Sequence, residues 1–246
     1  FPDAVAYTTF TTADPVTEMA AKVAAARELP LALEEALVRT ETYADYCVFE
    51  GRLPLPVYQQ GKPPYLTGGG GWGTEVDRWE TARIWVSVPR ESMPEEGYPV
   101  VVMSRTGGGG DRPLLDRGVR DASGNTLPGS GPAADFAAVG WAGVTLDGPL
   151  GGLRNPTGGD EQFLIFNIGN PAAMRDNLRQ SALELALLPP LLETFSLDAS
   201  GCVGSSPLAS LDLATLTLFG HSMGATIAPV AAAVAPEYRA LLLSGA

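Results

Sequence analysis

The chain has 246 residues, of which 45% are hydrophobic and 18% charged, a profile typical of a globular protein that buries one large core. Its formal net charge of −12 argues against a nucleic-acid partner, because phosphate binding needs a surplus of Lys and Arg. The chain contains a single histidine, His221, so any chemistry that needs a histidine base must use that residue or one from outside these 246 residues.

The first 80 residues predict an N-terminal extension. Apolar residues recur at helical spacing over residues 16–29 and again over residues 32–46. Residues 51–75 are rich in Gly, Pro and Tyr and predict a long loop or a set of short strands. We expect residues 1–80 to form an extension that wraps around a core of residues 81–246.

The rest of the sequence alternates between strand and helix patterns. We predict strands at residues 83–88, 99–104, 141–146, 213–219 and 239–244, and helices at residues 133–139, 171–188 (with Asn170 as its N-cap) and 223–234. The second of these helices is expected to stop at Pro189 and Pro190. This alternation predicts an α/β fold, with a mostly parallel sheet and helices on both faces. No run of 18 apolar residues occurs, so we expect no membrane-spanning helix.

The pattern Gly-x-Ser-x-Gly occurs between the strand at 213–219 and the helix at 223–234, formed by Gly220, Ser222 and Gly224. In this position the pattern predicts a nucleophile elbow, a sharp turn from which a serine hydroxyl projects. The two glycines allow close packing of strand and helix around the turn. The amide of Met223 lies at the start of the helix, where it can donate to a developing oxyanion.

Two further positions are interpreted from this turn. His221 is next to the serine in sequence, but neighbouring side chains on such an elbow point away from the nucleophile, so we expect His221 to have a structural role in the turn. The second oxyanion donor should follow an earlier central strand. Thr106 or Gly107, in the glycine-rich segment after the strand at 99–104, is the candidate.

The two cysteines leave three possibilities open. Cys47 and Cys202 can pair with each other, one can pair with a second chain, or both can be free buried thiols. Asp147, at the end of the strand at 141–146, is a candidate site carboxylate, although a loop-capping role is the simpler interpretation. Tyr58, Tyr65, Trp72 and Trp79 could line a pocket, although packing within the N-terminal extension is the simpler interpretation.

Four segments resemble a known group of proteins. YPVVVMSRTGGGGD, TLDGPLGGLRNP, FNIGNPAAMRDNLRQSALEL and LFGHSMGATIAPVAAAVAPEYRALLLSGA are similar to bacterial secreted α/β-hydrolases of lipase or esterase type, near the bacterial virulence-factor lipases. The resemblance covers roughly residues 47–246. It implies an α/β-hydrolase fold, hydrolysis of carboxylic esters, and a secreted, periplasmic or cell-surface location. By the same resemblance, Ser222 matches the nucleophile and Met223 the residue after it.

The sequence departs from this group at two places. Many members carry His-Gly where this chain has Ser104-Arg105, and also where it has Gly151-Gly152. A further shared block has no obvious chemical role, and helix capping and packing is the simpler interpretation of its polar residues; these are Asn167, Asn170, Asp176, Asn177, Arg179 and Gln180.

The base of a serine hydrolase is missing from the sequence. Such an enzyme needs a histidine, and usually a carboxylate to orient it, after later strands than the one that carries the serine. No Asp and no His follows Gly224, and Glu237 lies at a predicted helix end. We expect the hydrolase core to be incomplete and the triad to be completed from beyond Ala246, by a C-terminal fragment of the same protein present as a second chain. A truncated chain and an inactive natural fragment are the alternatives.

Two functions follow from these observations. The first is a serine esterase or lipase that acts on a small-molecule or lipid ester without metal or organic cofactor. The second is a non-catalytic binding or adhesion module built on a hydrolase fold, since fold alone does not fix function.

Overall fold

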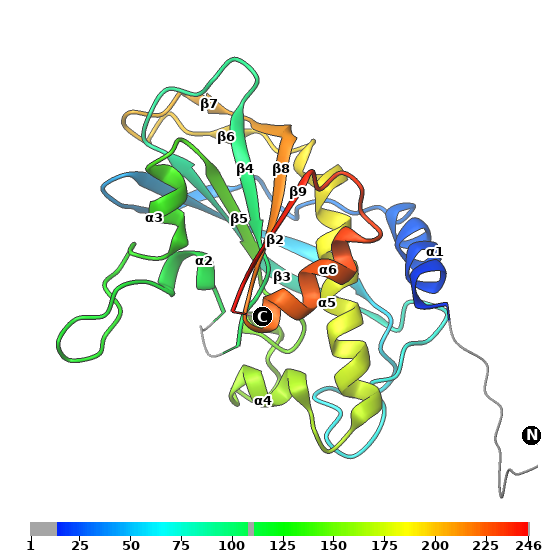
Figure 1. Ribbon diagram of the computed structural model, residues 1–246. Coiled ribbons are helices and arrows are strands. Elements are labelled where there is room, and N and C mark those ends of the chain that lie inside the picture. Colours follow the sequence, from blue (N-terminus) through cyan, green and yellow to red (C-terminus); the bar gives the residue numbers. More distant parts are fainter. Residues whose placement is uncertain (1–13, 108–110, 246) are drawn as a thin grey trace, which may run out of the picture.

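A sheet of seven strands organises the part of the chain that the computed structural model describes, residues 14–107 and 111–245, in the order β1-β2-β3-β5-β4-β8-β9 (Figure 1). The strands are β1 (Val38–Thr42), β2 (Tyr46–Val57), β3 (Arg78–Pro89), β4 (Tyr98–Met103), β5 (Ala142–Leu146), β8 (Leu211–His221) and β9 (Ala240–Ser244). A separate short hairpin pairs β6 (Leu197–Asp198) with β7 (Leu208–Ala209).

The helices lie on both faces of this sheet, as the alternating pattern predicted. They are α1 (Pro15–Arg27), α2 (Pro113–Asp116), α3 (Pro132–Ala137), α4 (Glu161–Phe166), α5 (Pro171–Leu192) and α6 (Met223–Ala232), with a 3₁₀ turn η1 (Gly152–Arg154). Figure 1 shows α2 and α3 on one side of the sheet and α1, α5 and α6 on the other. In the described ranges, no helix is both long and apolar enough to cross a membrane.

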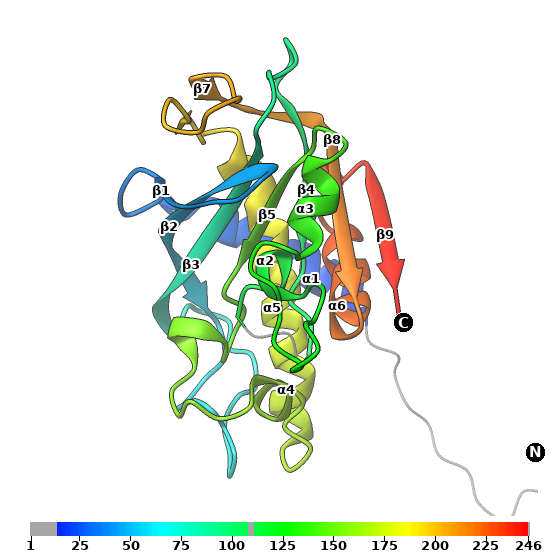
Figure 2. The same cartoon turned by 90° about the vertical axis from the view of Figure 1, so that its left-hand side faces the viewer.

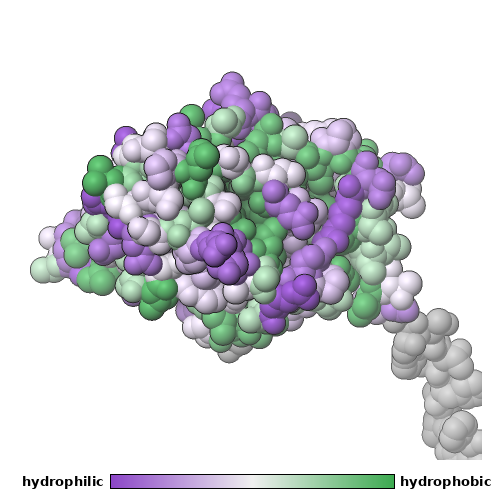
Figure 3. Space-filling view, turned by 90° about the horizontal axis from the view of Figure 1, so that it is seen from above, coloured by the Kyte–Doolittle hydropathy of each residue, from purple (hydrophilic) through white to green (hydrophobic). Residues whose placement is uncertain are grey.

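Parallel pairing dominates the half of the sheet that carries the serine. Strands β5, β4, β8 and β9 pair in parallel, whereas β3 pairs antiparallel with both β2 and β5. Within the seven-stranded sheet, all strands except β1 and β3 therefore run in the same direction. The carboxyl ends of β4, β5 and β8 meet at one edge, shown at the bottom of Figures 1 and 2, which is the edge where parallel sheets bind ligands. Figure 3 shows the opposite edge, where hydrophilic and hydrophobic residues are interspersed.

Two apolar cores lie on the two faces of the sheet. The larger core packs α1, α5 and α6 against residues such as Val86, Val100 and Leu218. The smaller core packs α2 and α3 against the opposite face, which includes Trp85 and Met103. Adjacent residues of one strand contribute to different cores, as the two-residue period of a strand requires.

The helix predicted over residues 32–46 is wrong. This region forms an irregular segment, strand β1 and the start of β2, because β2 pairs with β3 along its whole length and β1 adds to its outer edge. The domain boundary predicted at residue 80 falls inside β3, so strands from the predicted extension belong to the same sheet as the core.

Prolines concealed strand β2 from sequence analysis. Pro54 and Pro56 lie within it, but β1 pairs only with residues up to Glu50, so both prolines lie where the outer side of β2 has no neighbouring strand. Proline is tolerated there because it removes no ladder hydrogen bond.

Helix α5 does not stop at Pro189 and Pro190 as predicted, but continues to Leu192. The two prolines cannot donate to the carbonyls of Leu185 and Ala186, four residues earlier. Side chains replace the missing donors: the Tyr238 hydroxyl donates to Leu185 O at 2.7 Å, and Arg27 Nη2 donates to Ala186 O at 2.7 Å. The expected cost of a proline inside a helix is thereby offset by two long-range hydrogen bonds.

A disulfide joins Cys47 in β2 to Cys202 in the connection between β6 and β7, which decides among the three possibilities for the cysteines. Both cysteines are buried, and 155 residues separate them in the sequence. The bond therefore ties the connection before β8 to the sheet, at the end of the sheet opposite to Ser222.

Removing this disulfide is expected to destabilise the protein. A crosslink across so long a loop contributes about 2–4 kcal/mol, which corresponds to a fall in Tm of about 4–16 °C for a domain of this size. The measurement is thermal unfolding of Cys47→Ala/Cys202→Ala against the wild type. An unchanged Tm would mean that the bond is not formed in the protein.

Candidate functional site

Ser222 lies at a sharp turn between β8 and α6, in the conformation expected of a nucleophile elbow. Its φ is 54° and its ψ is −118°, a backbone region that side-chain-bearing residues rarely adopt. The turn is held by a hydrogen bond from Ser222 N to Ser244 O in β9, at 2.9 Å. The sequence prediction of a strand, a strained serine and a helix is therefore what the structure contains.

The two glycines of the motif allow the close packing that this turn needs. A Cβ on Gly220 would lie 2.4 Å from Gly224 O, and a Cβ on Gly224 would lie 2.6 Å from Arg105 O. Both distances are too short for any side chain. The elbow is thus packed directly against the backbone of the segment that follows β4.

The predicted oxyanion segment is brought to the elbow by this contact. Ser104 N donates to Phe219 O at 2.9 Å, which extends the pairing of β4 with β8 up to the turn. Thr106 is buried and Gly107 is half-buried just beyond. The remaining glycines of that run, residues 108–110, lie outside the described residues.

Met223 is the first residue of α6, and the first N–H groups of a helix have no carbonyl partner within the helix. The Met223 amide therefore lies where an oxyanion donor is expected, at the N-terminus of α6. The Met223 side chain is buried in the larger core, which fixes the start of the helix.

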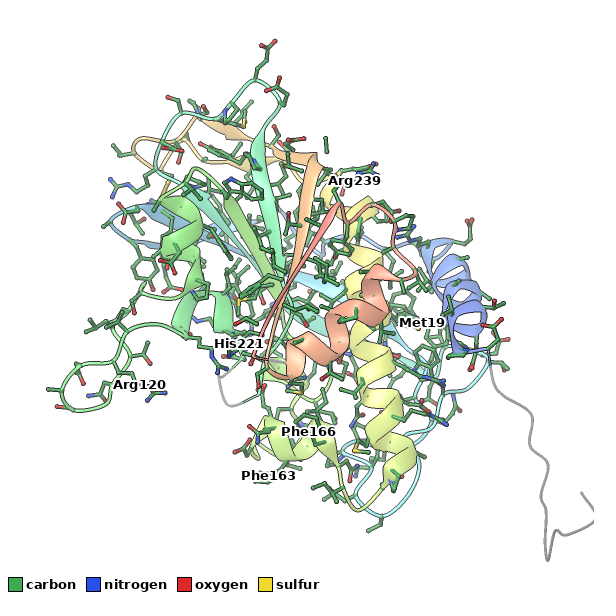
Figure 4. The ribbon with its side chains drawn as sticks, in the orientation of Figure 1. Met19, Arg120, Phe163, Phe166, His221 and Arg239 are labelled. Atoms are coloured by element: carbon green, nitrogen blue, oxygen red, sulfur yellow. A yellow bond between two sulfur atoms is a disulfide. The ribbon has the colours of Figure 1, made fainter. Side chains whose placement is uncertain are left out.

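The His221 side chain contacts the end of strand β9. Its Nδ1 lies 3.1 Å from Ser244 Oγ, and its ring packs against Gly245. In Figure 4 the labelled His221 lies beside the ends of β8 and β9. The structural role of His221 in the turn remains a prediction.

Arg105 lies where the resembling proteins often have glycine, and here it is a buried side chain. Its Nη1 donates to Pro149 O, and its Nη2 lies 3.2 Å from Glu161 Oε2 in α4. Burial lowers the pKa of Arg105, whereas Glu161 favours its charged form. Glu161 also accepts from Gly152 N at 2.8 Å, so the loops after β4 and β5 are joined through this one carboxylate.

Arg117, just after α2, also contacts the oxyanion segment, and sequence reasoning missed it. Its Nη1 donates to Thr106 Oγ1 at 2.8 Å and to Gly107 O at 3.0 Å. No sequence motif signals this contact, because it depends on how the chain returns after the glycine run.

Asp147 caps a loop and does not point into the site. Its buried carboxylate accepts from Arg83 Nε at 3.0 Å and from Leu153 N at 3.2 Å. A Cβ on Gly152 would lie 1.9 Å from Asp147 Oδ1, which explains why glycine stands at that position. The simpler interpretation from the sequence is the one that these contacts support.

A buried ion pair supports the loop after β5. Arg154 donates to Glu184 of α5 through both terminal nitrogens, at 2.7 Å each, and its Nε donates to Glu80 of β3 at 2.9 Å. Burial alone would lower the pKa of Arg154, but the charges and hydrogen bonds of the two glutamates raise it.

The polar residues of the shared block cap and pack α5, and they also hold the loop between β2 and β3. Gln180 Nε2 donates to Pro56 O at 2.8 Å, and Asn177 Oδ1 accepts from Gln59 Nε2 at 2.8 Å. Asp176 accepts from the amide of Trp72, and Asn170 caps the helix and binds the carbonyls of Tyr65 and Gly69. The other two members are Asn167, which binds the same loop, and Arg179, which lies near Asp176.

The aromatic residues considered for a pocket lie elsewhere. The rings of Tyr58 and Trp72 are 6.3 Å apart, with Lys22 Nζ 4.3 Å from the centre of the Tyr58 ring. Tyr65 is buried, and Trp79 is exposed on β3. Within the described residues, no group of three or more His, Cys, Asp or Glu side chains could hold a metal ion.

A pocket of about 390 Å³ opens beside the oxyanion segment. It is lined by two glycines and five residues with polar side chains, namely Gly158, Gly159, Thr106, Asp111, Asn155, Asp160 and Glu161. Two of its three carboxylates are paired with arginines, Asp111 with Arg83 and Glu161 with Arg105. The pocket therefore offers hydrogen-bonding groups with little uncompensated charge.

Solved structures identify the fold. The chain is similar to an acetyl xylan esterase from Paenibacillus sp. R4, with a TM-score of 0.55 and 15% identity over 95% of this chain. It is also similar to a protein from Bacteroides fragilis NCTC 9343 that carries a provisional assignment as an acetyl xylan esterase, with a TM-score of 0.52 and 13% identity over 92% of this chain. This chain spans 60% and 51% of the lengths of those two proteins.

The chain therefore has the α/β-hydrolase fold that the resemblance implied. The sequence identities are low, so these similarities establish the fold and not the activity. No protein-family profile matches the sequence. No curated protein matches it either.

Replacing Gly224 by alanine is expected to damage the site. The new methyl would meet the backbone of Arg105 at 2.6 Å, and neither backbone can yield without shifting the elbow from the oxyanion segment. We expect a loss of about 1–3 kcal/mol in the free energy of unfolding, measured by denaturant titration.

The matched control is Gly169→Ala, because a Cβ there would meet nothing within 4 Å. Equal stabilities of the two variants would contradict the close packing described for the elbow.

Proposed function

We propose that the protein is a serine hydrolase that acts on carboxylic esters, with Ser222 as the nucleophile. The observation that carries this proposal is the strained Ser222 at the first turn of α6, packed through Gly224 against the Ser104–Gly107 segment. A positive φ at a serine is costly and is retained where function requires it. Nucleophile and oxyanion donors then come from two adjacent parallel strands.

The reaction follows from this arrangement. Ser222 Oγ attacks the ester carbonyl carbon while its proton passes to a histidine base. The oxyanion accepts hydrogen bonds from the Met223 amide and from the amide of Thr106 or Gly107. The tetrahedral intermediate collapses, and the alcohol leaves with the proton from the base. Water then attacks the acyl-enzyme by the same route and releases the acid. These steps need no metal or organic cofactor.

The base and its carboxylate come, in this proposal, from residues outside the 246 of this sequence, on a C-terminal segment of the same protein or a second chain derived from it. The side chain of the single histidine, His221, is hydrogen-bonded to the Ser244 hydroxyl. Strand β9 is the outermost strand on its side of the sheet (Figure 2), and its residues Leu241, Leu242 and Leu243 are exposed. Further chain that covered this strand would both bury the leucines and deliver the base.

The polar pocket beside Thr106 favours an ester whose alcohol part is polar. Acetyl xylan esterases, to which the fold is similar, act by their name on acetyl groups carried by a polysaccharide. We therefore propose a short acyl group on a hydroxyl-rich alcohol in preference to the long-chain lipid esters of lipases.

An extracytoplasmic location is part of the proposal. Disulfides persist in oxidising compartments, and the buried Cys47–Cys202 bond is of this kind. The protein would then be secreted, periplasmic or held at the surface of a bacterial cell.

A non-catalytic binding module on the same fold is the second candidate. The observation that favours it is Arg105, a bulky buried residue where the resembling hydrolases often carry glycine beside the oxyanion hole. In that case the polar pocket would bind a ligand without turnover.

Covalent labelling distinguishes the two candidates. A fluorophosphonate probe should modify Ser222 in the full-length protein, and Ser222→Ala should abolish both labelling and hydrolysis of p-nitrophenyl acetate. Mass spectrometry of the labelled peptide provides the measurement. Labelling confined to another residue, or full activity of the alanine variant, would refute the nucleophile.

His221→Ala tests the origin of the base. Because His221 contacts Ser244 and not the nucleophile, the variant should keep at least a tenth of the wild-type kcat for p-nitrophenyl acetate. Loss of a base lowers the rate by about 10²-fold or more. A loss of that size in a folded variant would assign the base to His221.

A further inference from the structure

Two arginines anchor the Ser104–Gly107 segment, one from within it and one from the exposed side. Arg105, within the segment, extends into the protein and bonds to Pro149 O and Glu161. Arg117 reaches the segment from the exposed side and donates from one nitrogen to Thr106 Oγ1 and Gly107 O. The segment is therefore held between an internal and an external guanidinium.

The backbone of Arg117, the external arginine, is anchored by its neighbours. Arg117 immediately follows α2, whose Leu114 and Leu115 are fully buried in the smaller core. The chain leaves at Gly118 in a long projecting loop and returns at Gly131, whose amide donates to Leu115 O at 3.1 Å. Arg117 thus lies at the base of the loop, where its backbone is anchored.

Among the described residues, no carboxylate pairs with the guanidinium of Arg117. Every ion pair found among the described residues involves other groups, so no described carboxylate lies within ion-pair distance of its guanidinium. Arg105, in contrast, is compensated by Glu161. A fixed positive charge near the segment favours negative charge that develops there.

Gly107 makes such a contact necessary. A glycine has no side chain that could restrict its backbone, and it loses more conformational freedom on ordering than any other residue. Donor groups stabilise an oxyanion only when they are already oriented toward it. A group that bonds to both Thr106 and Gly107 supplies the missing restriction.

We propose that Arg117 is a positioning residue for the oxyanion-binding amides, acting through Thr106 and Gly107 and not through contact with substrate. This rests on the proposed ester hydrolysis. Because oxyanion donors act in the transition state, loss of Arg117 should reduce kcat and leave KM nearly unchanged.

The variants are Arg117→Ala and Arg117→Lys, with Arg120→Ala as the matched control. Arg120 lies out on the projecting loop (Figure 4), where it donates to Gly124 O at 2.9 Å. Each alanine variant removes one positive charge, Arg117 at the base of the loop and Arg120 further along it, but only Arg117→Ala removes the contact with the oxyanion segment.

In the full-length protein, Arg117→Ala should lower kcat for p-nitrophenyl acetate about 10- to 100-fold, less than the 10²- to 10³-fold lost when an oxyanion donor is deleted. KM should stay within about twofold, since ground-state binding is not altered. Arg117→Lys should recover part of the rate, and Arg120→Ala should equal the wild type. The pH profile of kcat/KM should keep its shape, because neither acid nor base is touched.

A second measurement does not depend on turnover. Hydrogen exchange of the peptide that contains residues 104–107 should be faster in Arg117→Ala than in Arg120→Ala. Equal exchange in the two variants, equal kcat, or a loss confined to KM would each overturn the positioning role. An inactive wild type or an active Ser222→Ala would instead refute the proposed function, which is a separate result.

Discussion

The loop after β5 is held in place by the buried ion pair of Arg154 and Glu184, and the packing around Ser222 depends on that loop. The ion pair joins the turn after β5 to the middle of α5, and Glu80 extends it to β3. Removing one partner of such a pair leaves an uncompensated buried charge and typically costs about 3–5 kcal/mol. The pair therefore fixes the position of the loop that contains Gly152, and through Glu161 the position of Arg105 beside the elbow. The position of the segment beside Ser222 thus depends partly on the contacts of the loop after β5.

The local parts of the site could be predicted from the sequence. A strand, a glycine-flanked serine and a helix follow one another within residues 211–232, and steric limits leave few conformations for the turn between them. Strands β4 and β5 at the centre of the sheet were also predictable, since both are short, mostly apolar runs with nearly every residue buried. Their predicted and observed ends differ by only a few residues.

Features that depend on distant partners could not be predicted. Strand β2 contains two prolines, which favour a loop in a prediction from sequence. They fit in a strand only because no neighbouring strand pairs with that part of its outer side. Helix α5 passes through Pro189 and Pro190 because Tyr238 and Arg27 bind the carbonyls that those prolines leave free. Arg117 belongs to the same group, since its contact with Thr106 exists only after the chain has folded back.

The disulfide gives the chain an unusual covalent layout. The ring closed by Cys47 and Cys202 contains β3, β4, β5 and α5, together with the projecting loop that begins at Gly118. Ser222 and the rest of the elbow lie outside the ring. A protease that cut the projecting loop would therefore not release a fragment, because the two pieces would remain one covalent molecule. Proteolysis at the rim of the site would become visible as two chains only after the bond was reduced.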